Sequence, residues 1–274
     1  LQLYTEAADI KRVIVNTHQL KPEFLVEFFG TLDAEMQMEC MVELLTNNLK
    51  ANQRLVATVA AKYSESVGAE KITTMFKENK ADEGLFLYLS TLVNSTLDPE
   101  VHFGYIEAAA RSNNIPEVER MTRESTAYDA EKVRDLLMEL KLQDPRPLIN
   151  VCNAHNFVPE LVKYFREQNQ MKFIEQYALK VNVAAVPIVC GTLIDLQTNE
   201  DFIKNLILAG GNMIPAKSLM DEMHSRSKLK MIMPWLEARV NEGSTDSAVH
   251  TALAKIYVDS NQNPEQFLLT NQYY

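Results

Sequence analysis

The side chains best suited to chemistry are scattered along this sequence rather than grouped. The histidines that stand alone are His18, His102, His224 and His250. Cys152 and His155 form the closest pair, and their spacing of three residues could place both on one face of a helix. Two ligands do not make a zinc site, and no second Cys/His pair lies nearby in the sequence. We therefore interpret Cys152 as a buried thiol and each lone histidine as a hydrogen-bonded or surface residue.

Motifs for phosphate, nucleophile or zinc chemistry are absent from the sequence. It contains no G-x-G-x-x-G, no P-loop, no G-x-S-x-G and no H-E-x-x-H. The carboxylate pairs Asp221–Glu222 and Glu117–Glu119 are ordinary on an acidic helical surface and carry no catalytic signal without a partner geometry. Gly210–Gly211 fits a helix C-cap better than a phosphate cradle. We predict no catalytic, cofactor-binding or metal-binding residue, and an enzyme is the least favoured class.

The charge balance limits the kinds of partner. The formal net charge is -10, so a phosphate backbone would be repelled and we expect no nucleic-acid partner. The most basic stretch, Arg226–Lys230 (RSKLK), is interpreted as a solvated helix face, and a phosphate or lipid-headgroup site is the minor alternative.

Cysteine usage indicates a reducing compartment, and hydropathy indicates that the chain does not enter a membrane. The three cysteines, Cys40, Cys152 and Cys190, are widely spaced in apolar helical contexts, which predicts buried free thiols rather than a disulfide framework. No run of about 18 apolar residues occurs, so we expect no direct membrane insertion. We find no signal peptide, and the start at Leu1 suggests a piece of a longer protein.

The stretch Asp98–Ser125 predicts a helix hairpin. Asp98 can cap the first helix, and Pro99 suits its first turn. The turn falls at Ser112–Asn114, and Asn114 with Glu117 has the spacing of a capping box for the second helix. Gly104 lies inside the first helix, where we expect it to permit a close approach between helices.

Similar helix start and stop signals recur along the chain and predict about 18 or 19 helices. We expect N-caps at Asp33 and Asp129, prolines at helix starts, and helix-terminating glycines at Gly30, Gly210 and Gly243, with a left-handed C-cap at Gly30. Pro234 lies inside an apolar stripe, so a kink or break near Met233 is predicted. The stretch Val181–Ile194 could be a buried strand, although Pro187 and its surroundings favour a helix.

Short loops make successive helices antiparallel neighbours, and the hairpins recur at roughly 30 residues, the period of helical repeat arrays. Only 8 glycines occur, which argues against a sheet-rich fold with many tight turns. We predict an all-α stack of hairpins in contact with their neighbours only, a rod of roughly 80–90 Å. Periodicity alone leaves a compact all-α globule open.

The sequence resembles the clathrin heavy chain family over essentially all 274 residues. The blocks that carry the resemblance, in the family's order, are DIKRVIVNTH (Asp9–His18), Asp98–Ser125, EDFIKNLIL (Glu200–Leu208), PWLEARVNEG (Pro234–Gly243) and IYVDSNQNPEQFLLTNQYY (Ile256–Tyr274). It departs from the family at Gln272, where a proline is expected, and at Asn153–His155.

This resemblance implies a right-handed α-solenoid of stacked antiparallel hairpins, the clathrin heavy-chain repeat, similar to a TPR superhelix. Residues 1–60 would end one leg repeat, 61–205 would be a complete repeat, and 206–274 would start the next. The segment would be a non-enzymatic structural rod in the distal leg, without catalytic, cofactor or metal sites. The parent's propeller, light-chain-binding stretch and hub helix would lie elsewhere.

The implied partners are other clathrin heavy chain legs, assembled as triskelia and cages at the cytoplasmic face of coated pits and coated vesicles. The clathrin light chain would bind the parent chain outside this segment. Because the leg is acidic, we expect it to self-repel at neutral pH and to pack better as carboxylates and histidines take up protons. The alternative is an adaptor-type helical-repeat scaffold of a vesicle-sorting complex that binds partner proteins, but no aromatic or charged stripe recurs at the repeat period.

Overall fold

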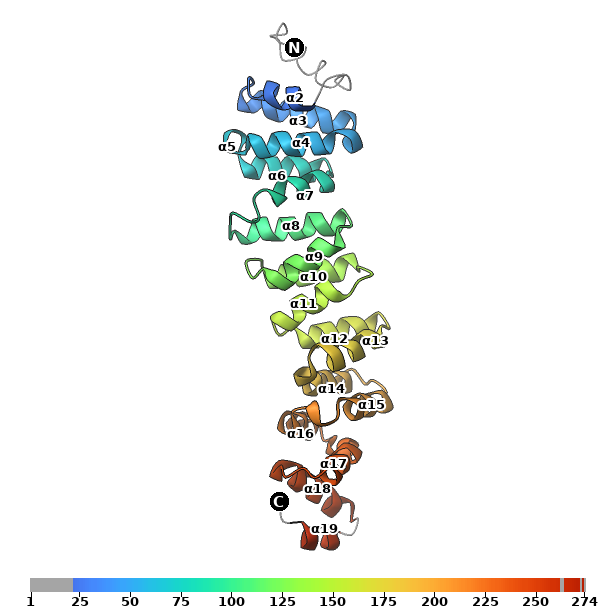
Figure 1. The fold of residues 1–274 in the computed structure, drawn as a ribbon. Coiled ribbons are helices and arrows are strands. Elements are labelled where there is room, and N and C mark those ends of the chain that lie inside the picture. The colour runs from blue at the N-terminus through green and yellow to red at the C-terminus, as the bar shows by residue number, and fades with distance from the viewer. Residues whose placement is uncertain (1–21, 262–263, 272, 274) are drawn as a thin grey trace. The chain divides into compact units, whose positions relative to one another are not determined.

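A computed structural model describes residues 22–261, 264–271 and 273. Within these residues the chain forms eighteen α-helices, α2 to α19, and no strand, so the all-α prediction is confirmed (Figure 1). The block Asp9–His18, which carries part of the resemblance, lies outside the described residues. The helices belong to two compact units, residues 1–147 (the N-terminal unit) and 148–274 (the C-terminal unit).

The N-terminal unit is a series of short helices joined by tight turns. Its helices are α2 Pro22–Phe29, α3 Ala34–Asn47, α4 Leu49–Lys62, α5 Ser64–Val67, α6 Ala69–Glu78, α7 Asp82–Ser90, α8 Pro99–Arg111, α9 Ile115–Glu124 and α10 Ala130–Leu140. Helix α4 packs on α7, α7 on α8, and α8 on both α9 and α10. The unit is therefore built from contacts between neighbouring hairpins, as expected for a helical repeat.

The C-terminal unit contains most of α11 Arg146–Ala154, which crosses the boundary between the two units. Its other elements are α12 Val158–Glu167, α13 Met171–Gln176, a π turn Tyr177–Val181, a 3-10 turn Val183–Ala185, α14 Val186–Asp195, α15 Glu200–Gly210, a 3-10 turn Gly211–Met213, α16 Ala216–Ser225, a 3-10 turn Leu229–Ile232, α17 Met233–Asn241, α18 Ser247–Ser260 and α19 Pro264–Thr270. Helix α14 packs on α12 and α16, and α18 packs on α16 and α17. The same neighbour-to-neighbour stacking thus builds the second unit.

Several helix starts are confirmed by their capping geometry. The Asp33 carboxylate accepts from the Met36 amide at 2.8 Å, the Asp98 carboxylate from Glu100 at 3.0 Å, and the Asp129 carboxylate from Glu131 at 3.1 Å. Each bond satisfies a backbone N–H that has no partner inside its helix. These helices begin where short-range chemistry predicts.

Two ambiguous places in the C-terminal unit are resolved as helix. The stretch Val181–Ile194 forms the end of a π turn, a 3-10 turn and most of α14, so the strand alternative is wrong and the favoured helix is confirmed. Pro234 lies in the first turn of α17, directly after the 3-10 turn Leu229–Ile232. The predicted break near Met233 is confirmed, because the proline ring and its missing N–H cannot continue the preceding turns.

The prediction of a left-handed cap at Gly30 is wrong. The glycines with positive φ are Gly68, Gly211 and Gly243. Gly30 instead leaves room for a tyrosine, since a Cβ atom on it would lie 2.6 Å from the Tyr63 hydroxyl. That hydroxyl donates to the carbonyl of Val26 at 2.9 Å. A contact between helices α2 and α4, rather than backbone conformation, explains the glycine.

Two helical glycines in the N-terminal unit allow close packing. A Cβ on Gly104 would lie 3.3 Å from the Leu89 side chain, and one on Gly84 would lie 2.7 Å from the Phe76 ring. The predicted close approach at Gly104 is therefore confirmed. Gly84 sits in the tighter place, because Phe76 is fully buried.

No single helix among the described residues is long and apolar enough to cross a membrane. The segments Met171–Val181 and Val183–Asp195 pass together by length and composition alone, with a bend of 118° between them. Both supply buried side chains to the C-terminal unit, including Tyr177 and Leu193.

Candidate functional site

Ion pairs tie helices of successive hairpins together in both units. In the N-terminal unit these pairs are Lys62–Glu27, Arg54–Glu83, Lys77–Glu107 and Lys132–Glu100. In the C-terminal unit they are Arg226–Asp195 and Lys228–Glu200. The partners lie 28 to 35 residues apart, which is about one hairpin. Such exposed pairs are individually weak and are screened by salt.

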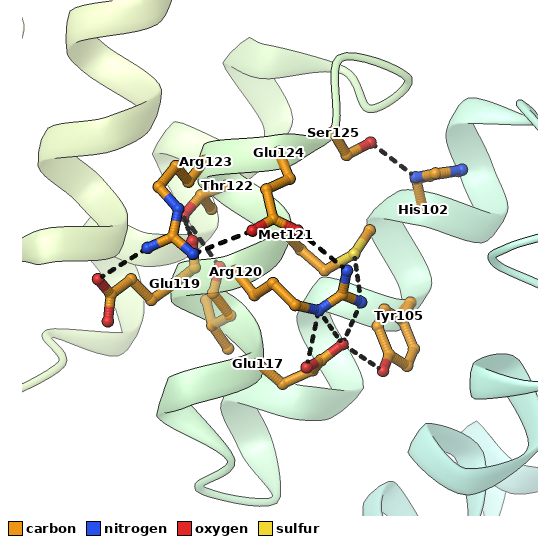
Figure 2. Close-up of polar contacts among 11 residues, drawn as sticks. His102, Tyr105, Glu117, Glu119, Arg120, Met121, Thr122, Arg123, Glu124 and Ser125 are labelled. Atoms are coloured by element: carbon orange, nitrogen blue, oxygen red, sulfur yellow. Dashed lines mark hydrogen bonds and ion pairs between the residues drawn. The ribbon is translucent and has the colours of Figure 1, made fainter.

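The hairpin of α8 and α9 holds a denser polar cluster (Figure 2). The Tyr105 hydroxyl donates to the Glu117 carboxylate at 2.8 Å. The Arg120 guanidinium donates to both oxygens of the same carboxylate, with its Nε at 3.0 and 3.1 Å. A further Arg120 nitrogen lies 3.4 Å from Glu124. One carboxylate thus joins α8 to α9 through a phenol and a guanidinium.

This geometry changes the acid–base properties of the cluster. Hydrogen bonding to Arg120 holds the pKa of the Glu117 carboxyl below its ordinary value, against an opposing effect of burial. Burial and the bond to Glu117 raise the pKa of the Tyr105 phenol. Glu117 therefore stays ionised and Tyr105 stays neutral near pH 7, the states that their hydrogen bond requires.

A second set of ion pairs continues from α9 to the start of α11. Glu119 lies 3.6 Å from Arg123 and 3.0 Å from Arg146. Arg146 also binds Asp144, and this bond lowers the pKa of the Asp144 carboxyl. The acidic pair Glu117–Glu119 is thus used for two separate arginine contacts.

His102 links three parts of the same hairpin. It is 5% exposed, and its Nε2 lies 2.9 Å from the Thr96 carbonyl oxygen. Its Nδ1 lies 2.9 Å from the Ser125 hydroxyl. Because a carbonyl only accepts, Nε2 carries the proton and Nδ1 accepts from Ser125. The ring fastens the loop before α8 to the residue that follows α9.

The C-terminal unit repeats this arrangement at His250, which is 3% exposed. Its Nε2 lies 2.6 Å from the Ser244 carbonyl oxygen, and its Nδ1 lies 2.5 Å from the Asn271 amide nitrogen. The repeat is visible in the sequence as D-x-x-V-H, which ends at residue 102 and again at residue 250. The equivalent histidines are therefore 148 residues apart. Our interpretation of single histidines missed this pattern, although it correctly predicted hydrogen-bonded residues.

The capping box predicted at Asn114 and Glu117 is wrong. Asn114 is the N-cap of α9 by backbone position, but its side chain makes no capping bond. The Glu117 side chain turns to Arg120 and Tyr105 instead. The Asn114 amide that a capping box would use already donates to the Ala109 carbonyl at 2.8 Å, and the bonds of Glu117 to Arg120 are charge-assisted.

The stretch Arg226–Lys230 is not a solvated helix face, so that prediction is also wrong. Arg226 ends α16 and reaches across to Asp195 of α14 at 2.7 Å. Lys228 precedes the 3-10 segment Leu229–Ile232, and Lys230 lies inside that segment. Short-range pattern could not show this, because Asp195 is 31 residues away.

The cysteines and the other histidines considered in the sequence analysis are placed as follows. Cys40, Cys152 and Cys190 are free and buried, as predicted. His155, which we paired with Cys152 by spacing, stacks on Phe157, with ring centroids 6.2 Å apart. His224 is exposed, and His18 lies outside the described residues. The described part of the chain contains no group of three or more His, Cys, Asp or Glu side chains that could hold a metal ion.

The fold and these contacts define a helical-repeat protein whose polar side chains mainly fasten one hairpin to the next. A family model described as a region in clathrin and VPS proteins matches residues 60–201 and 208–274. The chain is 50% identical to clathrin heavy chain 2 of Oryza sativa subsp. japonica over 274 residues, which are 100% of this chain and 16% of that protein.

Further relatives show the same relationship. The chain is 49% identical to the clathrin heavy chain of Dictyostelium discoideum over 275 residues, and 44% identical to clathrin heavy chain 2 of Homo sapiens over 274 residues. In both cases all of this chain is covered, together with 16% and 17% of the relative. The chain belongs to the clathrin heavy chain family. It spans about 16% of the length of the first relatives it matches.

Proposed function

We propose that the chain is a structural rod segment of the clathrin heavy chain leg and packs against other legs in the polyhedral coat of coated pits and vesicles. The observation that carries the proposal is the stacking of hairpins, with ion pairs between successive hairpins, in both units of a chain of this family. Contacts between neighbours let small rotations add up along a stack without opening a core. Such a segment would transmit shape and load in endocytosis and intracellular vesicle transport.

We further propose that residues 1–60 end one leg repeat, 61–205 form a complete repeat, and 206–274 start the next. The two segments matched by the family model begin at residues 60 and 208. These two starting residues are 148 positions apart, the same separation as that between His102 and His250. Equivalent hydrogen bonds at those two histidines support a repeat of this length.

The proposed partners are other heavy chain legs on the cytoplasmic face of coated pits and vesicles, assembled as triskelia and cages. The light chain would bind the parent chain outside this segment. The segment would have no enzymatic role and no nucleic-acid partner, in keeping with its net charge of -10. No relative favours the adaptor-type scaffold over this role.

The proposal is tested by cage assembly of a longer heavy chain that carries this segment. Reversing exposed carboxylates, for example Glu35→Lys, Glu43→Lys and Glu70→Lys together, should lower cage yield while the helical circular dichroism stays unchanged. A matched set would reverse Glu160, Glu175 and Asp221 in the C-terminal unit. Unchanged assembly in both sets, measured by sedimentation, would contradict a packing role for these faces.

The pH hypothesis has its own test in the same assay. Uptake of protons by histidines, and at lower pH by carboxylates, reduces the self-repulsion of an acidic leg, so cage yield in fixed salt should be higher at about pH 6 than at about pH 8. Equal yields would remove the electrostatic part of the proposal and leave the structural role standing.

A further inference from the structure

A cationic hollow lies in the C-terminal unit of this otherwise acidic chain. It has a volume of about 950 Å³ and is lined by α15, the turn between α16 and α17, and α18. Its lysines are Lys204, Lys228, Lys230 and Lys255. The carboxylates that face it are Glu200 and Asp259. Lysines thus outnumber carboxylates in the lining, whereas the whole chain carries a net charge of -10.

The four lysines differ in whether they form ion pairs within the chain. Lys228 lies 2.6 Å from Glu200, and Lys204 lies 4.0 Å from the same carboxylate. Lys230 and Lys255 form no ion pair with any residue in the described ranges. Among the described residues, the hollow therefore presents two ammonium groups that take part in no ion pair, one from a 3-10 turn and one from α18, where Asp259 also lines the space.

A second pocket of mixed polar and apolar lining adjoins the hollow. It has a volume of about 320 Å³ and shares Lys204, Met231 and Pro234 with the first. Its other lining includes Trp235 and Leu208, and the Leu208 side chain is 47% exposed. Because the two pockets share these residues, we treat them as one groove and call it the lysine groove. Its second part is lined by Leu208 together with the charged Asp201 and Lys204.

The local fold explains why the groove is open. Ser227, the second residue after α16, has a left-handed φ of 56°, and the Lys228 amide donates to the Met223 carbonyl at 2.8 Å. Pro234 then starts α17 as a separate helix. Because the break prevents one continuous helix from α16 to α17, the lysines of the turn line a hollow instead of following a helix surface.

We propose that the lysine groove binds a short acidic peptide segment of a partner protein that carries a large apolar side chain. The carboxylates of the segment would contact Lys230 and Lys255, and the apolar side chain would lie against the exposed Leu208. The combined volume suits several residues of extended peptide and is far larger than one phosphate group needs. A membrane is the less suitable partner, since the site is concave and half apolar within an acidic chain.

The test uses the 274-residue chain and a fluorescein-labelled peptide of sequence EDEFDLE, with binding followed by fluorescence anisotropy. Saturable binding is expected. The double variant Lys230→Glu/Lys255→Glu should weaken it by about tenfold, equivalent to about 1.4 kcal/mol. The matched control Lys163→Glu/Lys217→Glu changes two exposed lysines outside the groove by the same charge. It should change the dissociation constant by less than about twofold, within the ordinary spread of such effects.

Further measurements distinguish recognition of the apolar side chain from binding of negative charge alone. The peptide EDESDSE should bind more weakly than EDEFDLE, and Leu208→Ser should remove much of that difference. The single tryptophan, Trp235, provides a local readout, because its emission should shift when the groove is filled. Circular dichroism of each variant checks that the helices are retained.

Several results would overturn the proposal. They are no saturable peptide binding, equal weakening by the control variant, equal affinity for the serine-containing peptide, or displacement of the peptide by inorganic phosphate at similar concentration. Binding to vesicles containing a phosphoinositide without binding to the peptide would assign the groove to a lipid headgroup instead.

Discussion

The Nδ1 atom of His102 lies 2.9 Å from the hydroxyl of Ser125, 23 residues further along the chain. This bond closes the α8–α9 hairpin at the end opposite its turn. The partner of the same ring on its other side is the Thr96 carbonyl. A buried imidazole that satisfies both of its nitrogens fixes the loop and the two helices together.

Replacing His102 should therefore destabilise the chain more than replacing Ser125. His102→Ala leaves a cavity and an unpaired carbonyl, and we expect a loss of about 2–4 kcal/mol in the free energy of unfolding. Ser125→Ala removes one hydrogen bond and should cost about 1 kcal/mol. Urea unfolding measures both. Equal losses would show that the bond to Ser125, rather than the ring's full set of contacts, carries the effect.

Glu117 should contribute to acid unfolding. Its pKa is lowered by Arg120 in the folded state relative to the ordinary value of 4.5. The stabilisation is therefore present above about pH 4.5 and is lost as pH falls toward the folded-state pKa. Glu117→Gln should lower stability near pH 7 and flatten its decline between about pH 5 and pH 3.

Urea unfolding of the parent chain and the Glu117→Gln variant across that range provides the measurement. Glu139→Gln changes an exposed glutamate of α10 and serves as the control. If the Glu117→Gln variant lost stability with acid as steeply as the parent chain, the ion pair with Arg120 would not be the source of the dependence.

Gly84 and Gly104 should respond differently to alanine, although both lie inside helices. A Cβ at Gly84 would approach the buried Phe76 ring to 2.7 Å, so Gly84→Ala should cost about 1–3 kcal/mol. At Gly104 the nearest atom is the end of the Leu89 side chain at 3.3 Å, which can move slightly. The gain of about 1 kcal/mol in helix propensity should then leave Gly104→Ala close to neutral.

Thermal or urea unfolding of the two variants tests this ordering. Equal destabilisation would mean that the α7–α8 contact at Leu89 is as rigid as the contact at Phe76.

The three cysteines should be unreactive in the folded chain. Each is fully buried, and burial raises the pKa of the Cys190 thiol to about 12. Because the thiolate is the reactive species, a disulfide reagent should modify the native chain slowly and should titrate three thiols after denaturation. Rapid reaction of one thiol in native buffer would show local opening around that cysteine.

Features decided within a few residues were predictable. The caps at Asp33, Asp98 and Asp129, the break at Pro234 and the all-α class follow from the backbone needs of each turn and from apolar periodicity. The buried cysteines could also be predicted, since their neighbours place them on apolar helix faces.

Features decided by contacts between helices were not predictable from local pattern. Glu117 has the spacing of a capping residue, but Tyr105 and Arg120 offer its carboxylate stronger bonds. Gly30 follows a helix as a cap would, but Tyr63 fills the space beside it.

The sequence by itself determined the all-α class, several helix starts and the break at Pro234, because capping, proline geometry and periodicity act over one or two turns. Its order of sequence blocks also carried the family resemblance. Only the tertiary structure decided which charges are paired and which remain available. Arg226 meets Asp195 across a hairpin, while Lys230 and Lys255 meet an open groove. Partners about 30 residues apart come together only when the hairpins stack, so no local pattern records their distance.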